Sequence, residues 1–90
     1  MNKVLIKYCP KCRWLPRSTW MAQELLTTFG EEINELSLQP SKSGVFRVIV
    51  NDVTVWDRKE MDGFPEIKIL KQKVRDVIAP DKTLGHSDRK

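Results

Sequence analysis

The sequence predicts one small α/β domain with the element order β-α-β-β-β-α. Three observations lead to this prediction: two short strand-like runs flank an amphipathic segment, two β-branched runs are separated by a two-residue turn, and a second amphipathic segment follows. A chain of 90 residues with 40% hydrophobic residues can build one compact core. We expect a four-stranded mixed sheet with both helices packed on it.

The first half of the chain predicts a strand, a helix and a second strand. Residues 3–8, KVLIKY, are apolar and short, which is typical of a buried strand. Over about residues 16–29 apolar side chains recur every three or four positions, which indicates an amphipathic helix, and Gly30 is expected to cap its end. Residues 33–40 predict the next strand. Such a unit joins two parallel strands by a right-handed crossover.

The middle of the chain predicts a β-hairpin. The runs VFRVIV (45–50) and VTVWDR (53–58) are rich in β-branched residues and are separated only by Asn51 and Asp52. Asn and Asp tolerate the left-handed backbone conformations that a tight hairpin turn requires. We therefore expect two antiparallel strands at this position.

The last part of the chain predicts a loop and a second helix. Residues 59–64, KEMDGF, are expected to form the loop, after which Pro65 suits a first helical position and Glu66 lies near the positive end of the helix dipole. The inner stripe of this helix consists of Ile67, Leu70, Val74, Val77 and Ile78. We predict a domain over residues 1–79 and a disordered tail over residues 80–90.

Charge and hydropathy narrow the classes of partner. The net charge is +4, but basic residues alternate with acidic ones, as in DRKEMD and KILKQKVRD, so a nucleic-acid partner is not predicted. No apolar run approaches the roughly 20 residues that span a bilayer. The start, MNKVLIKY, is too short and too charged for a secretory signal. We expect a cytoplasmic protein without a membrane partner.

Both cysteines lie in the stretch YCPKCRWLPR, residues 8–17. Cys9 follows the first predicted strand and Cys12 precedes the first helix, the end of an α/β sheet where sites usually lie. In a reducing compartment a C-x-x-C pair indicates redox chemistry or metal binding. Lys11, Arg13 and a helix N-terminus would each favour the thiolate, which is the attacking species. We predict Cys9 and Cys12 as the catalytic residues.

Two prolines leave two local geometries open. Either Pro10 opens a helix that kinks at Pro16, or CPKC forms its own turn and the regular helix begins near Leu15. We favour the second geometry. In that case the helix dipole influences Cys9 more weakly than a simple picture suggests.

A metal-binding or sensing role is the alternative to catalysis. Two cysteines do not complete a tetrahedral zinc site, and His86, the one histidine, lies in the predicted tail. Two thiolates can bind Cu(I), but copper carriers of this size run β-α-β-β-α-β, whereas this chain ends in a helix. We assign no metal site and keep as the alternative a non-enzymatic protein that carries Cu(I) or senses redox state.

The ordered set YCPKC, RWLPRSTWMAQELLTTFG, SGVF and DGFPEIKILKQKVRD resembles the bacterial members of the selenoprotein W/T/H-like redox family, the Rdx family, over about residues 3–78. The resemblance implies a thioredoxin-like fold and a thiol–disulfide oxidoreductase linked to glutathione or thioredoxin. Client protein thiols or disulfides would be its partners, and glutathione its one implied co-substrate. In selenoprotein W a selenocysteine stands where Cys12 stands here, which favours Cys12 as the reactive residue. Thioredoxins instead imply a more exposed, attacking Cys9, and this is the assignment we predict.

Four residues around the cysteines are predicted to bind the substrate or partner: Tyr8, Lys11, Trp14 and Gly44. Trp14 is either an exposed platform beside the dithiol or a ring packed on the sheet edge. Tyr8 either donates a hydrogen bond near a thiolate or is structural. Thioredoxins carry a cis-proline facing the dithiol, and Ser43 and Gly44 stand at the comparable place here. Gly44 would let the backbone approach the sulfurs.

Overall fold

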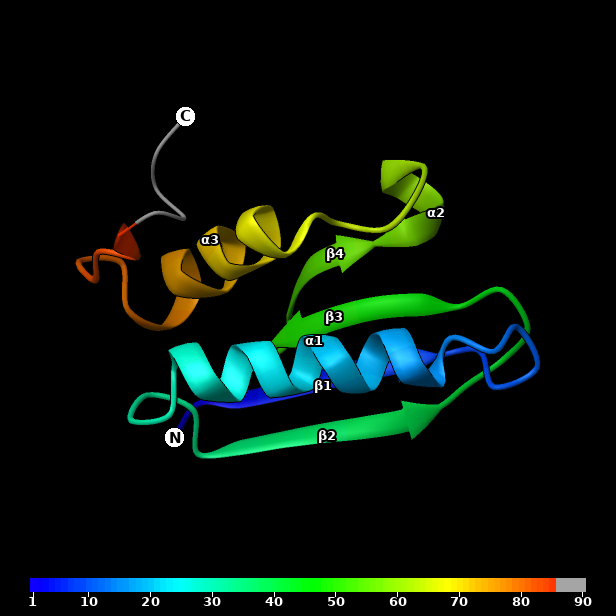
Figure 1. Cartoon of the computed structure of the whole chain (residues 1–90), viewed down its shortest axis with the longest axis horizontal. Coiled ribbons are helices and arrows are strands. Elements are labelled where there is room, and N and C mark those ends of the chain that lie inside the picture. The colour runs from blue at the N-terminus through cyan, green and yellow to red at the C-terminus, as the bar shows by residue number, and fades with distance from the viewer. Residues whose placement is uncertain (86–90) are drawn as a thin grey trace.

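The computed structural model describes residues 1–85, which contain four strands and three helices. In chain order they are β1 (Lys3–Tyr8), α1 (Leu15–Thr28), β2 (Glu35–Pro40), β3 (Phe46–Val50), β4 (Val53–Asp57), α2 (Arg58–Met61) and α3 (Ile67–Ile78). The strands form one sheet in the order β2-β1-β3-β4, with β1 parallel to β2 and antiparallel to β3. The predicted mixed α/β fold is confirmed (Figure 1).

One face of the sheet carries the hydrophobic core. In β1 and β3 every second residue is buried, and the register pairs these residues as Val4 with Val50, Ile6 with Val48, and Tyr8 with Phe46. Both helices contribute to the same cluster, α1 through Met21, Leu25 and neighbours, and α3 through Leu70 and Val74. Burying each such large side chain contributes about 1.5–3 kcal/mol. The helices α1 and α3 therefore cover one face of the sheet and leave its other face uncovered (Figure 1).

The predicted hairpin joins β3 to β4. Asn51 and Asp52 have φ values of 49° and 68°, the left-handed conformations that a two-residue hairpin turn of type I′ requires. The two strands pair antiparallel, with a register shift between Val48 and Ile49 that marks a bulge. The hairpin prediction is thus confirmed.

The end of α1 differs from the prediction. Phe29, not Gly30, is the cap residue, and its N–H donates to the carbonyl of Leu25 at 2.8 Å. The Phe29 carbonyl in turn accepts the N–H of Ile33 at 2.8 Å. Phe29 is completely buried, so the demand to bury its ring fixes the chain here and no left-handed glycine is needed.

The predicted loop 59–64 contains the short helix α2. The carboxylate of Asp57 caps this helix by accepting the N–H of Lys59 at 3.0 Å, and Asp62, with φ of 54°, ends it in a left-handed conformation. A helix of one turn shows no periodicity, so the pattern of apolar residues could not indicate it.

The helix α3 begins two residues later than predicted. Pro65 is buried and precedes the helix, and Glu66 is the cap residue, with an extended backbone and no hydrogen bond from its side chain. The first helical hydrogen bond runs from the N–H of Leu70 to the carbonyl of Glu66, at 3.0 Å. Within residues 1–85 no helix is long and apolar enough to cross a membrane.

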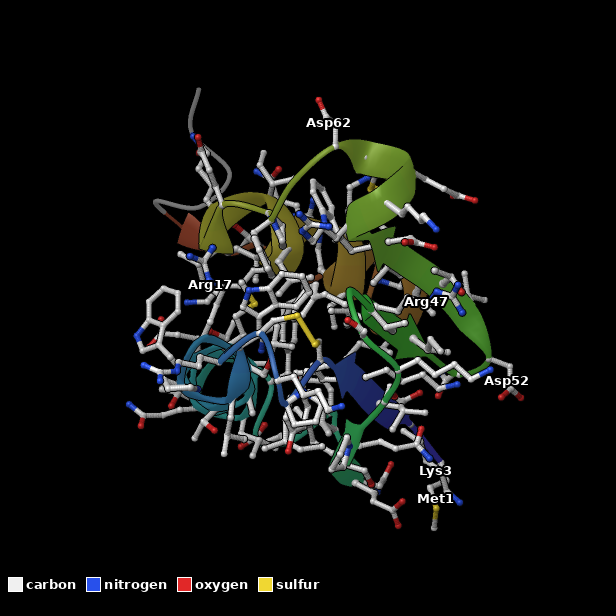
Figure 2. The ribbon with its side chains drawn as sticks, turned by 90° about the vertical axis from the view of Figure 1, so that its right-hand side faces the viewer. Met1, Lys3, Arg17, Arg47, Asp52 and Asp62 are labelled. Carbon is white, nitrogen blue, oxygen red and sulfur yellow. A yellow bond between two sulfur atoms is a disulfide. The ribbon has the colours of Figure 1, made fainter. Side chains whose placement is uncertain are left out.

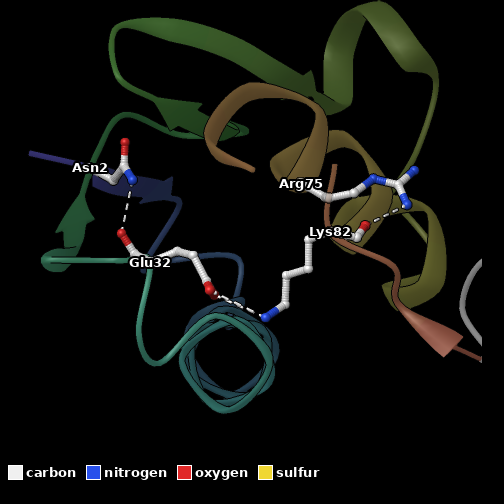
Figure 3. A network of polar contacts seen from close by, with 4 residues as sticks. All are labelled: Asn2, Glu32, Arg75 and Lys82. Carbon is white, nitrogen blue, oxygen red and sulfur yellow. Dashed lines mark hydrogen bonds and ion pairs between the residues drawn. The ribbon is translucent and has the colours of Figure 1, made fainter. Parts of the chain in front are cut away.

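The segment after α3 contacts the domain as far as it is described. Lys82 places its Nζ 3.2 Å from Glu32 Oε1, and its carbonyl accepts a hydrogen bond from Arg75 Nη1 at 3.3 Å (Figure 3). Leu84 packs against the core. The tail predicted to be disordered comprises residues 80–90, of which 86–90 lie outside the described residues. Packing of the chain therefore continues beyond residue 79 to Leu84.

Candidate redox site

The C-x-x-C segment forms a turn of its own between β1 and α1. The carbonyl of Pro10 accepts the N–H of Arg13 at 3.2 Å, and Arg13 adopts a left-handed conformation with φ of 60°. Trp14 is the cap of α1, and Leu15 and Pro16 occupy its first two positions. Pro tolerates this location because the first helical N–H groups have no partner within the helix. The predicted separation of the turn from the helix is confirmed.

Cys9 and Cys12 form a disulfide, with their Cα atoms 5.3 Å apart (Figure 2). The N–H of Cys12 also donates to Cys9 Sγ at 3.2 Å. Cys9 has no exposed surface, whereas Cys12 is partly exposed. The expectation that Cys9 is the more exposed cysteine is therefore wrong. Cys9 directly continues the central strand β1, whereas Cys12 lies in the surface turn.

The loop of residues 41–45 crosses the end of β1 where Cys9 begins. The register places Tyr8 between Pro40 of β2 and Phe46 of β3, so the chain from β2 to β3 must pass over this end of the strand. The N–H of Ser41 donates to the carbonyl of Tyr8 at 2.7 Å. This crossing helps to explain why Cys9 is buried at the end of β1.

Gly44 lies in this loop with φ of 78°. A Cβ at this position would meet no atom within 4 Å. The left-handed backbone conformation therefore explains the glycine, and a close approach to the sulfurs does not. Of the other predicted partner-binding residues, Tyr8 is buried in the core and Lys11 is exposed in the turn.

Trp14 packs beside the disulfide turn in a cluster of aromatic rings. Its ring meets that of Phe64 edge to face, with 4.9 Å between centroids and an angle of 85°. Phe64 also lies 4.9 Å from the ring of Phe46. Trp14 is partly buried and packs against the core, which matches the packed alternative. We call Trp14, Phe46 and Phe64 the aromatic cluster.

Two guanidinium groups cover the aromatic cluster, and the sequence did not point to either. The Arg17 guanidinium lies 4.1 Å from the centroid of Phe64, and that of Arg58 lies 4.7 Å from the centroid of Trp14. Such contacts contribute about 0.5–1 kcal/mol at exposed sites. Arg17 gave no local signal, because Phe64, the ring that it covers, lies far from it in the sequence. Arg58 comes from the unpredicted helix α2.

Metal ligands do not gather around the sulfurs in the described part of the chain. Among residues 1–85 no three His, Cys, Asp or Glu side chains are grouped so that they could hold a metal ion. The two sulfurs are bonded to each other, so a site made of both thiolates would first require reduction. The geometry described here is that of a disulfide.

The fold and the site together define a class of protein. A disulfide between cysteines spaced C-x-x-C, at the junction of the first strand and first helix of a small mixed sheet, is the arrangement of thioredoxin-like redox domains. A family model described as the Rdx family matches residues 3–76. The chain belongs to the Rdx family, as its resemblance to selenoprotein W-like proteins predicted.

Solved structures of bacterial proteins agree with this assignment. A selenoprotein W-related protein from Vibrio cholerae is 49% identical, with a TM-score of 0.83, and the match covers 84% of this chain and 95% of that one. A protein from Bordetella parapertussis is 52% identical, with a TM-score of 0.81, and the match covers 83% of this chain and 95% of that one. No curated protein matches the chain. Family and cysteine geometry both fit a redox role.

Proposed function

We propose that this protein is a thiol–disulfide oxidoreductase in which Cys12 reacts with the partner and Cys9 resolves. The observation that carries the proposal is the disulfide between a buried Cys9 and a partly exposed Cys12. A partner sulfur must approach the sulfur that it attacks, so access selects Cys12. This reverses our prediction that Cys9 attacks, and it agrees with the selenocysteine position in selenoprotein W.

The reaction balances as two successive thiol–disulfide exchanges. The thiolate of Cys12 attacks a client disulfide, which forms a mixed disulfide and releases the first client thiolate. The thiolate of Cys9 then attacks Cys12 Sγ, which restores the Cys9–Cys12 disulfide and releases the second client thiolate. The protein loses two electrons to the client, and the two protons of its thiols end on the client thiols.

One hydrogen bond of the turn supports Cys9 as the resolving residue. The N–H of Cys12 lies 3.2 Å from Cys9 Sγ, so a Cys9 thiolate would accept it as a charge-assisted hydrogen bond. Cys9 is a leaving group whenever a thiolate attacks Cys12 Sγ, and a stabilised thiolate leaves faster. The same hydrogen bond therefore assists reduction of the Cys9–Cys12 disulfide, in which Cys9 is the leaving group.

The turn and its surroundings indicate which residues meet the partner. Lys11 is exposed between the two cysteines, and Trp14, which is partly buried, lies two residues beyond Cys12. Gly44 shapes the loop beside the site, and Tyr8 supports it from the core. A return to the dithiol requires a thiol reductant, for which we propose glutathione or the thioredoxin system in a reducing cytoplasm.

A redox titration combined with trapping tests the proposal. In graded mixtures of reduced and oxidised dithiothreitol the wild type should titrate as one two-electron couple, and the Cys9→Ser, Cys12→Ser double variant should show none. Cys9→Ser should accumulate mixed disulfides with a disulfide-containing client peptide, whereas Cys12→Ser should form them far more slowly. A pair that stays reduced under strong oxidant would refute the redox role. Faster trapping by Cys12→Ser would reverse the two assignments.

A further inference from the structure

The fold gathers basic side chains around the disulfide, although they alternate with acidic residues along the chain. They come from β1, the C-x-x-C turn, α1, the loop before β3, β3 itself and α2. We call this group the basic rim: Lys7, Lys11, Arg17, Lys42, Arg47 and Arg58. Figure 2 looks at this end of the molecule, with the disulfide between Arg17 on one side and Arg47 on the other.

Stacking holds two members of the basic rim in place. Arg17 lies over Phe64 and Arg58 lies over Trp14, at 4.1 and 4.7 Å from the ring centroids. A guanidinium on a ring face keeps its N–H groups free to meet a carboxylate at its edge. These two charges are thus partly ordered before a partner arrives, which lowers the entropy lost on binding.

A hollow lies on the open face of the sheet, next to the end of the molecule that carries the disulfide. It has a volume of ≈ 440 Å³, and the residues that line it are all basic or neutral: Lys7, Gln39, Pro40, Ser41, Lys42, Val45 and Arg47. Lys7 and Arg47 are direct cross-strand partners. Like charges opposite each other cost stability, and Asp57, 3.1 Å from Arg47 Nε, offsets only part of this repulsion.

Within the described residues 1–85, the C-x-x-C turn, the first turn of α1 and the loop of residues 41–45 contain no acidic residue. Asp57 is engaged with Arg47, and Asp62 projects from the far end of α2, away from the sulfurs, as Figure 2 shows. We therefore expect a positive electrostatic potential around Cys12 Sγ. An electrostatic potential of one sign around a reactive group raises the rate of encounter with partners of opposite charge.

We propose that the basic rim selects acidic polypeptide clients, in which carboxylates lie on either side of the reacting cysteine. This inference rests on the proposed function, because the client sulfur must reach Cys12 Sγ. Rim residues lie on opposite sides of the disulfide, with Arg17 on α1 and Arg47 on β3 (Figure 2). This spread suits an extended segment of a client polypeptide better than one small anion. The exchange step is the one described above, with the charges acting on encounter and orientation.

Three matched peptides test the inference on the oxidised wild-type protein. Each carries one cysteine flanked by Glu, by Gln or by Lys, and the measured quantity is the rate of reduction of the Cys9–Cys12 disulfide. Flanking charges also change the peptide thiol itself, so each rate is divided by that peptide's rate with the uncharged hydroxyethyl disulfide. At low salt the Glu peptide should then react about tenfold faster than the Lys peptide. Salt should reduce this ratio as it screens the charges.

Variants on opposite sides of the disulfide sharpen the test. Arg17→Gln with Lys42→Gln should reduce the ratio of the Glu-peptide rate to the Gln-peptide rate, because two of the six rim charges are removed. Charge reversal at both positions, Arg17→Glu with Lys42→Glu, leaves four basic residues against two acidic ones in the rim and should reduce this ratio further. Lys3→Gln is the matched control, because it removes an exposed charge at the other end of β1.

The outcomes separate the inference from the proposed function. Equal normalised rates for the three peptides at low salt would overturn the inference and leave the redox function standing. A failure of all peptides and of the dithiothreitol titration would refute both. Inhibition by a short DNA duplex that Arg17→Gln with Lys42→Gln abolishes, without any dependence on peptide charge, would assign the rim to nucleic acid and also overturn the inference.

Discussion

The two ends of β1 are stabilised in different ways. At the amino end three asparagines tie the strand to its neighbours: the N–H of Asn2 donates to Asn34 Oδ1 at 2.7 Å, and the N–H of Lys3 donates to Asn51 Oδ1 at 2.8 Å. Asn51 Nδ2 then donates to Asn2 Oδ1 at 2.9 Å. At the carboxyl end the N–H of Ser41 donates to the carbonyl of Tyr8 at 2.7 Å, and the Cys9–Cys12 disulfide follows the strand directly. The amino end is held by hydrogen bonds alone, whereas the carboxyl end also carries the bond that the proposed exchange would make and break.

This difference explains how a small domain can change its covalent structure without losing its fold. The core beneath the disulfide is aromatic, and the asparagine ties lie a full strand length away. Reduction therefore removes a constraint from the turn while the sheet register remains fixed from the amino end. Substitutions at each end should accordingly separate stability from redox behaviour.

The largest effect on the free energy of unfolding should come from a substitution in the core beneath the carboxyl end of β1. Phe46→Ala removes a ring that is 1% exposed and contacts Phe64. Truncation of a buried Phe costs about 3–5 kcal/mol through lost transfer energy and the cavity that remains. We expect this loss in the free energy of unfolding by urea, together with a looser aromatic cluster and a changed redox potential.

The control for this prediction is Met61→Ala in α2. Met61 is 41% exposed, so its truncation should change the free energy of unfolding by about 0.5 kcal/mol or less. A loss below about 1 kcal/mol for Phe46→Ala would mean that the ring is not an essential part of the core under the disulfide.

The second largest effect on the free energy of unfolding should come from a substitution at the amino end of β1. Asn51→Ala removes two side-chain hydrogen bonds, about 0.5–1.5 kcal/mol each, and places alanine at a φ of 49°, which costs about 1–2 kcal/mol more. Asn51→Gly loses the same hydrogen bonds but adopts this φ freely. Both variants should unfold at lower urea concentration, alanine before glycine, with the wild-type redox potential.

Two results would contradict this reasoning. Equal stability of the two variants would show that the left-handed conformation carries no cost at this turn. A shifted redox potential in either variant would show that the ends of β1 are energetically coupled, which the separation of their contacts does not predict.

The fold was predictable from sequence wherever periodicity and turn chemistry agreed. The short apolar run in KVLIKY, the Asn51–Asp52 turn and the stripe through Leu70 and Val74 each indicated the element that the structure contains. The two prolines around the cysteine turn were equally informative, since Pro16 fixed the start of α1. Local chemistry was sufficient in these cases, because each signal lies within one element.

What the sequence did not reveal depends on contacts between distant segments. The burial of Cys9 follows from the crossing of residues 41–45 over the end of β1, which no local pattern contains. The stacking of Arg58 on Trp14 joins α2 to the start of α1. Basic residues that alternate with acidic ones along the chain converge only when these segments meet.

The smallest effect on the free energy of unfolding should come from the ion pair between Lys82, in the segment after α3, and Glu32, in the connection from α1 to β2. Lys82 Nζ donates to Glu32 Oε2 at 3.3 Å and lies 3.2 Å from Oε1 without a well-directed hydrogen bond to it. With side-chain exposures of 34% and 23%, solvent screens the pair substantially, so Lys82→Met should cost about 0.2–1 kcal/mol. Lys82→Arg, which keeps the charge, is the control. The loss should shrink in about 1 M salt and leave the redox potential unchanged, and a salt-independent loss would assign the effect to packing of the lysine stem instead.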